Sequence, residues 1–70
     1  MASMNEGDNG FTVQVQEEAG GWRVAIVDPA GAVVGQRACH DHVEARAYAS
    51  TVRQHIYWLT PETFRAYYRV

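Results

Sequence analysis

Apolar and polar residues alternate strictly from Phe11 to Gln16, which predicts a β-strand with one buried face. A polar turn with two glycines follows over residues 17–21, where the glycines are free to take positive φ angles. Residues 22–28 alternate again, but their second face carries only Arg23 as a strongly polar residue. We therefore expect this second strand to be central and partly covered on both faces.

The segment Asp28-Pro29-Ala30-Gly31 has the residues of a type I turn followed by a bulge. Residues 32–39 then continue as a third strand. Two short turns that join three strands predict an antiparallel β-meander.

The period of the pattern changes after residue 40. Asp41 and Glu44 have the spacing of a capping box, with Asp in the place of Ser or Thr. Beyond them the apolar positions recur at helical spacing, which predicts one amphipathic helix over residues 43–58: Ala45, Tyr48, Ala49, Val52, Ile56 and Leu59. The small residues near its start would let the helix approach a sheet closely.

The last eleven residues permit two interpretations. Thr60-Pro61-Glu62 combines an N-cap, a proline at the first helical position and an acid in the first turn, and Phe64, Tyr67 and Tyr68 then share one helical side. The alternative is a strand over residues 64–70, in which every second residue faces the same way. The agreement of the start signals favours the helix.

The predicted fold is therefore a small α+β domain over residues 11–70, a three-stranded antiparallel meander packed by one amphipathic helix, with a short C-terminal helix. Residues 1–10 are polar and lack periodicity, and we expect a disordered N-terminal segment there.

Composition narrows the class of protein. A chain of 70 residues makes one domain, and its apolar runs of four residues or fewer cannot span a membrane. No secretory signal is visible, a single Cys cannot form an internal disulfide, and we expect a cytoplasmic protein. The large aliphatic residues are few, nine Val, two Ile and one Leu, so dimerisation or tight partner binding is an expected source of further stability.

The stretch from Phe11 to Leu59 resembles two kinds of protein. FTVQVQEEAGGWRVAIVD and HDHVEARAYA resemble the hairpin, third strand and Glu-Ala helix start of HicB-like antitoxins. The Pro-Gly-Cys-type segment of that family is not reproduced by residues 29–31, and its DNA-binding C-terminal extension has no counterpart here. Residues 31–35 and the Ala-rich helix start are also similar to certain very small anti-CRISPR proteins of phages. Both resemblances imply a non-catalytic protein that binds and inhibits another protein.

One cluster has the residue types of a metal or nucleophile site: Cys39, His40, Asp41 and His42, with His55 further along. Adjacent residues at a strand end point in opposite directions, and His55 lies roughly 20 Å from His42 along a helix. No oxyanion arrangement or phosphate-binding glycine motif accompanies the cluster. We therefore predict no metal, no cofactor and no catalytic residue.

Charge is polarised along the chain. The formal net charge is −2, with −4 in residues 1–35 and +2 in residues 36–70. Arg37, Arg46 and Arg53 are the candidates for a nucleic-acid surface, but direct binding usually needs a denser positive footprint. Glu17 and Glu18 could instead imitate phosphate charge towards a basic partner.

Aromatic and Arg residues, the types enriched at interface hot spots, crowd the C-terminal end. The candidate partner-binding residues are Tyr57, Trp58, Arg65, Tyr67, Tyr68 and Arg69, together with Glu17 and Glu18. The leading hypothesis is a non-enzymatic inhibitor that occludes a surface of a larger protein or nucleoprotein complex, as an anti-CRISPR protein or antitoxin does. The alternatives are a self-associating structural module, such as a homodimer, and a small nucleic-acid-binding domain.

Overall fold

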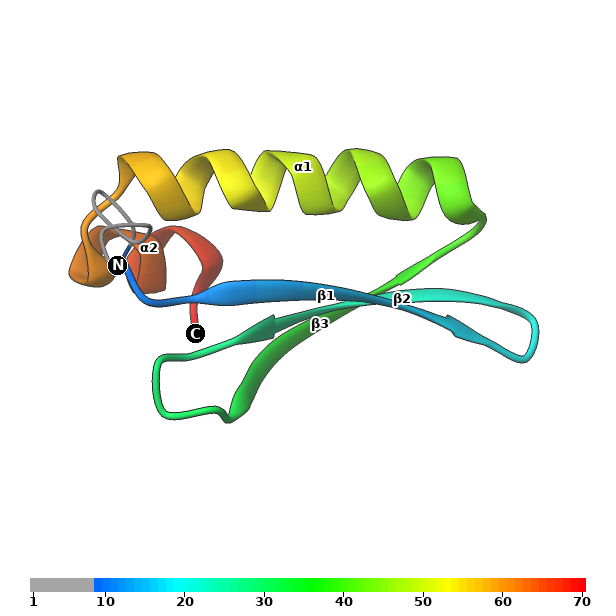
Figure 1. Cartoon of the computed structure of the whole chain (residues 1–70), viewed down its shortest axis with the longest axis horizontal. Helices are drawn as coiled ribbons and strands as arrows, with labels where there is room; N and C mark the ends of the chain where they lie inside the picture. The colour runs from blue at the N-terminus through cyan, green and yellow to red at the C-terminus, as the bar shows by residue number, and fades with distance from the viewer. Residues whose placement is uncertain (1–8) are drawn as a thin grey trace, which may run out of the picture.

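The computed structural model describes residues 9–70 and has two layers (Figure 1). Strands β1 (Thr12–Glu18), β2 (Gly21–Val27) and β3 (Val33–Cys39) precede helices α1 (His42–Trp58) and α2 (Pro61–Tyr68). The antiparallel sheet has the order β1-β2-β3, and α1 lies along one of its faces. The predicted α+β meander with two helices is confirmed, and the C-terminal segment is a helix rather than a strand.

The β1–β2 connection is tighter than the sequence pattern indicated. Glu18 pairs with Gly21, so only Ala19 and Gly20 remain in the turn, and the acidic pair belongs to β1. Gly20 adopts a φ of +83°, whereas Gly21 lies in β2 without a positive φ. The expectation that both glycines serve the turn was therefore wrong for Gly21.

The β2–β3 turn forms around Asp28, as its sequence predicts. The Asp28 carboxylate accepts hydrogen bonds from the backbone N–H groups of Ala30 at 3.0 Å and Ala32 at 2.9 Å. Gly31, at a φ of +94°, donates its N–H to the Asp28 carbonyl. A register shift beside Ile26 and Val27 marks the bulge expected after this turn.

Both helices begin with side-chain caps that the sequence predicted. Asp41 Oδ1 accepts a hydrogen bond from the Glu44 backbone N–H at 2.8 Å, and the Glu44 carboxylate accepts one from the His40 N–H. Thr60 caps α2 by accepting from the N–H of Thr63 at 3.2 Å. These caps fix where each helix leaves the preceding segment.

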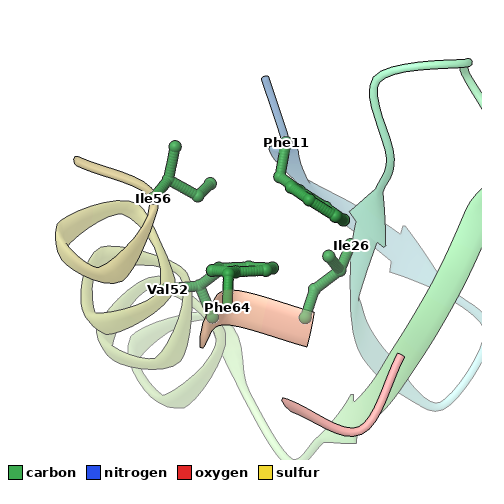
Figure 2. Close-up of a cluster of buried hydrophobic side chains, with 5 residues drawn as sticks. All are labelled: Phe11, Ile26, Val52, Ile56 and Phe64. Atoms are coloured by element: carbon green, nitrogen blue, oxygen red, sulfur yellow. The ribbon is translucent and has the colours of Figure 1, made fainter. Parts of the chain in front are cut away.

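The core lies between α1, α2 and the sheet face that carries Val24 and Ile26. Figure 2 shows the larger of two clusters, which joins both helices to the start of the sheet: Phe11, Ile26, Val52, Ile56 and Phe64. The second cluster lies near the start of α1 and contains Val24, Cys39, Ala45 and Ala49. On the opposite sheet face Ala25 and Val27 are also buried whereas Arg23 is not, so the central strand is partly covered on both faces as expected.

Asn9 forms two hydrogen bonds with the C-terminal end of α1 and the residue after it. Its backbone N–H donates to the Ile56 carbonyl, and its side-chain amide donates to the Leu59 carbonyl at 3.1 Å. Residues 1–8 of the segment predicted to be disordered lie outside the described residues. Within residues 9–70, no helix is both long and apolar enough to cross a membrane.

Candidate protein-binding surface

Three large aromatic side chains are exposed where α1 ends and α2 runs: Tyr57, Trp58 and Tyr67, which we call the aromatic end. Their exposed fractions are 58%, 72% and 63%. Neighbouring helical residues diverge by about 100°, so Tyr57 and Trp58 cannot follow Ile56 into the core. Both side chains are exposed instead.

The His55 ring packs against both tyrosines of α2. Its ring centroid lies 4.6 Å from that of Tyr67 and 5.6 Å from that of Tyr68, and the two tyrosine rings are 4.9 Å apart. The Tyr68 hydroxyl lies 2.5 Å from Nδ1 of His55, within hydrogen-bond distance. Tyr67 therefore packs against two aromatic rings while much of its surface stays exposed.

Tyr68 differs from its neighbour because it belongs partly to the core. It is half-buried, and its ring centroid lies 4.7 Å from that of Phe64. Burial, with smaller contributions from Tyr48 and Tyr67, raises the pKa of Tyr68 to about 12 from 10.0. Its main role is to anchor α2, and a partner would meet Tyr67 first.

This pKa shift predicts a loss of stability in alkali. Because the folded chain holds the Tyr68 proton more tightly than the unfolded chain, the contribution is full below pH 10 and is lost as the pH rises towards 12. Denaturant unfolding followed by circular dichroism across this range should show a smaller decline for Tyr68→Phe. Tyr57→Phe, at an exposed position, should keep the wild-type decline. An equally steep decline in both variants would contradict the assignment.

The two arginines of the C-terminal candidate set have different surroundings. The Arg65 guanidinium lies 5.0 Å from the centroid of the Phe11 ring, where it covers the large core cluster. Arg69 is exposed and ends α2 in the left-handed conformation, at a φ of 59°. Truncating Arg65 would therefore disturb packing as well as charge.

The acidic candidates lie at the other end of the molecule. Glu17 and Glu18 end β1 at the hairpin, whereas α2 lies where β1 begins (Figure 1). Both Glu18 oxygens accept from Arg23, at 2.7 and 2.9 Å, and this hydrogen bonding lowers the pKa of Glu18 and raises the pKa of Arg23. Arg23 also donates to Gln36 at 2.6 Å. Glu17 makes no ion pair with any described residue, so it is the acid more available to a partner.

The three arginines proposed for nucleic acid do not form one surface. Arg37 lies over the Tyr48 ring, 4.8 Å from its centroid, on the side of α1 next to β3. Arg53 lies on the side next to β1, where it lines a groove of about 270 Å³ with Phe11, Thr12, Val13, Ile56 and Tyr57. Arg46 lies two turns before Arg53, in a second hollow of about 310 Å³. A nucleic-acid backbone that contacted all three arginines would therefore have to cross α1 from one side to the other.

The cysteine–histidine cluster is dispersed by the fold. Cys39 is buried, the His40 side chain is 90% exposed, and the His42 ring packs 4.5 Å from that of Trp22. The hydrogen bond from the Glu44 N–H, with the nearby His40, lowers the pKa of Asp41, which serves as the helix cap. Across residues 9–70, no three His, Cys, Asp or Glu side chains form a group that could hold a metal ion.

Two residues with structural roles at these surfaces were missed by sequence reasoning. His55 was considered only as a metal ligand, although it positions both α2 tyrosines. Phe11 was assigned to the strand alone, although it also lines the groove beside Arg53. Residue spacing within separate elements does not indicate which side chains meet between elements, so neither role could be found from the sequence pattern.

Comparison of the chain with protein-family models, with curated proteins and with solved structures found no match. The surface must therefore be interpreted from its own chemistry.

Proposed function

We propose that this chain is a non-enzymatic binding protein that inhibits a larger partner by occluding part of its surface. The observation that carries the proposal is the aromatic end, where Tyr57, Trp58 and Tyr67 are exposed and Tyr67 packs against the ring of His55. Tyr and Trp bury large areas at low entropic cost when a partner covers them, which is why they dominate interface energetics.

Rigid support makes this surface better suited to binding than scattered exposed aromatics. Tyr67 packs on His55, and α2 is fixed by Phe64 in the core and by the Thr60 cap. A side chain that is already ordered loses less rotamer freedom on binding. The resemblance to anti-CRISPR proteins and antitoxins supplies the expected partner classes, a nucleoprotein complex or a toxin.

Affinity capture from a lysate of the native host tests this proposal. The immobilised chain should retain one main partner, and the double substitution Trp58→Ala with Tyr67→Ala should release it. Tyr68 should be left intact, because its contacts with His55 and Phe64 support the fold. Circular dichroism checks that the variant remains folded.

The matched control replaces exposed apolar residues elsewhere, Val33→Ala with Val43→Ala, whose exposed fractions are 52% and 77%. This variant should keep the partner. A nuclease-containing complex would support the anti-CRISPR class, and a small toxin the antitoxin class. Equal capture by both variants would exclude the aromatic end, and recovery of the bait alone would favour the self-associating alternative.

A further inference from the structure

The outer edge of β1 has the features of a strand that accepts a partner. β1 is an edge strand of the sheet. Glu18 and Gly21 close the two-residue turn to β2, so they form a hydrogen-bonded pair. Hydrogen-bonded pairs then recur at every second residue, which are the even-numbered residues of β1 from Thr12 to Glu18. The N–H and C=O groups of Val13, Val15 and Glu17 therefore point away from the sheet. β1 contains no Lys, Pro or bulge that would prevent edge pairing, whereas the other edge carries the register shift.

Two unpaired charges lie on the same side of this edge. Side chains alternate along a strand, so Glu17 shares the side of Val13 and Val15, which pack towards α1. Arg53 projects from α1 into the groove beside Thr12 and Val13, at the opposite end of β1 from Glu17. Neither charge has an ion-pair partner among the described residues.

We propose that a second copy of this chain pairs antiparallel with β1, so that Val15 faces Val15 of the other copy and Val13 faces its Glu17. This register uses only the outward-pointing backbone groups. Residues directly opposite on an antiparallel pair have Cβ atoms about 5 Å apart. The glutamate of each copy therefore reaches the groove that contains Arg53 of the other, and the two-fold axis forms the ion pair twice.

The position of α1 is compatible with this six-stranded dimer. The helix lies chiefly over β1 and β2, so the two copies of α1 would flank the axis. With strands spaced about 4.8 Å apart, their axes would be about 10 Å apart, a normal distance for packed helices. Ser50, midway between Arg46 and Arg53 on the facing side, is small enough for such an approach. Pairing would cover the half-buried Val13 and Val15.

Sedimentation velocity over a concentration series tests the pairing directly. The wild-type chain should reach twice the 7.8 kDa mass of one chain. Glu17→Arg and Arg53→Glu should each raise the dissociation constant by at least about tenfold, because each places two like-charged pairs at the interface. An equimolar mixture of these two variants should recover the wild-type affinity. A mixed dimer has two opposite-charge pairs, one as in the wild type and one with its signs exchanged.

Arg37→Glu is the matched control. It reverses the same charge on the β3 side of α1, away from the β1 edge, and should leave the dimer intact. Circular dichroism should show that all the variants remain folded. A monomeric wild-type chain, a dimer that tolerates both single substitutions, or a mixture without recovery would each overturn the proposal. Because no aromatic-end residue is changed, its failure would leave the proposed function standing.

Discussion

Replacement of Phe64 by alanine is expected to remove a large fraction of the free energy of unfolding. Phe64 is fully buried, and its ring centroid lies 4.5 Å from that of Phe11 and 4.7 Å from that of Tyr68. Truncation of a buried phenylalanine costs about 3–5 kcal/mol. A domain of this length has about 4–10 kcal/mol in total, at roughly 0.05–0.15 kcal/mol per residue.

Urea unfolding followed by circular dichroism measures this loss. Phe64→Leu fills most of the volume and should lose much less, and Tyr67→Ala, at an exposed position on the same helix, should stay within about 1 kcal/mol of the wild type. A Phe64→Ala midpoint close to that of the wild type would mean that α2 is not docked as described. The result bears on function, because α2 carries Tyr67 and supports the aromatic end.

Local pattern was sufficient to predict the elements of the fold. The alternation in β1, the Asp28 turn, the Asp41–Glu44 capping box and the Thr60-Pro61 helix start each have a local physical cause, and each appears in the structure. Errors were confined to ends: β1 runs through Glu18, and α1 begins at His42. A two-residue turn accounts for the first difference, because it releases Glu17 and Glu18 to pair with β2.

The candidate surface was predicted less completely because its geometry depends on contacts between distant segments. Sequence grouped Tyr67 and Tyr68 together, yet the packing of α2 exposes one and ties the other to His55 and Phe64. It also grouped Arg37 with Arg53, which the fold places on opposite sides of α1. The different burial of the two tyrosines and the separation of the two arginines depend on how the helices pack on the sheet, which periodicity does not specify.

Enlarging Ala49 to leucine tests that placement of α1 and is expected to be the second most damaging change. Ala49 is fully buried in the cluster that contains Val24 and Cys39. Three extra carbons must be accommodated among these buried side chains, so the helix must shift or the new side chain must take a strained rotamer. Overpacking of this kind costs about 1–3 kcal/mol, which unfolding by urea would resolve.

Ala47→Leu is the matched control, because it makes the same substitution on the exposed side of the same helix. Both residues are good helix formers, so its stability should stay within about 0.5 kcal/mol of the wild type. If the two variants unfolded at the same urea concentration, the close approach of α1 to the sheet would be wrong. A loss confined to Ala49→Leu would support the packing of this side of α1 against Val24 and Cys39.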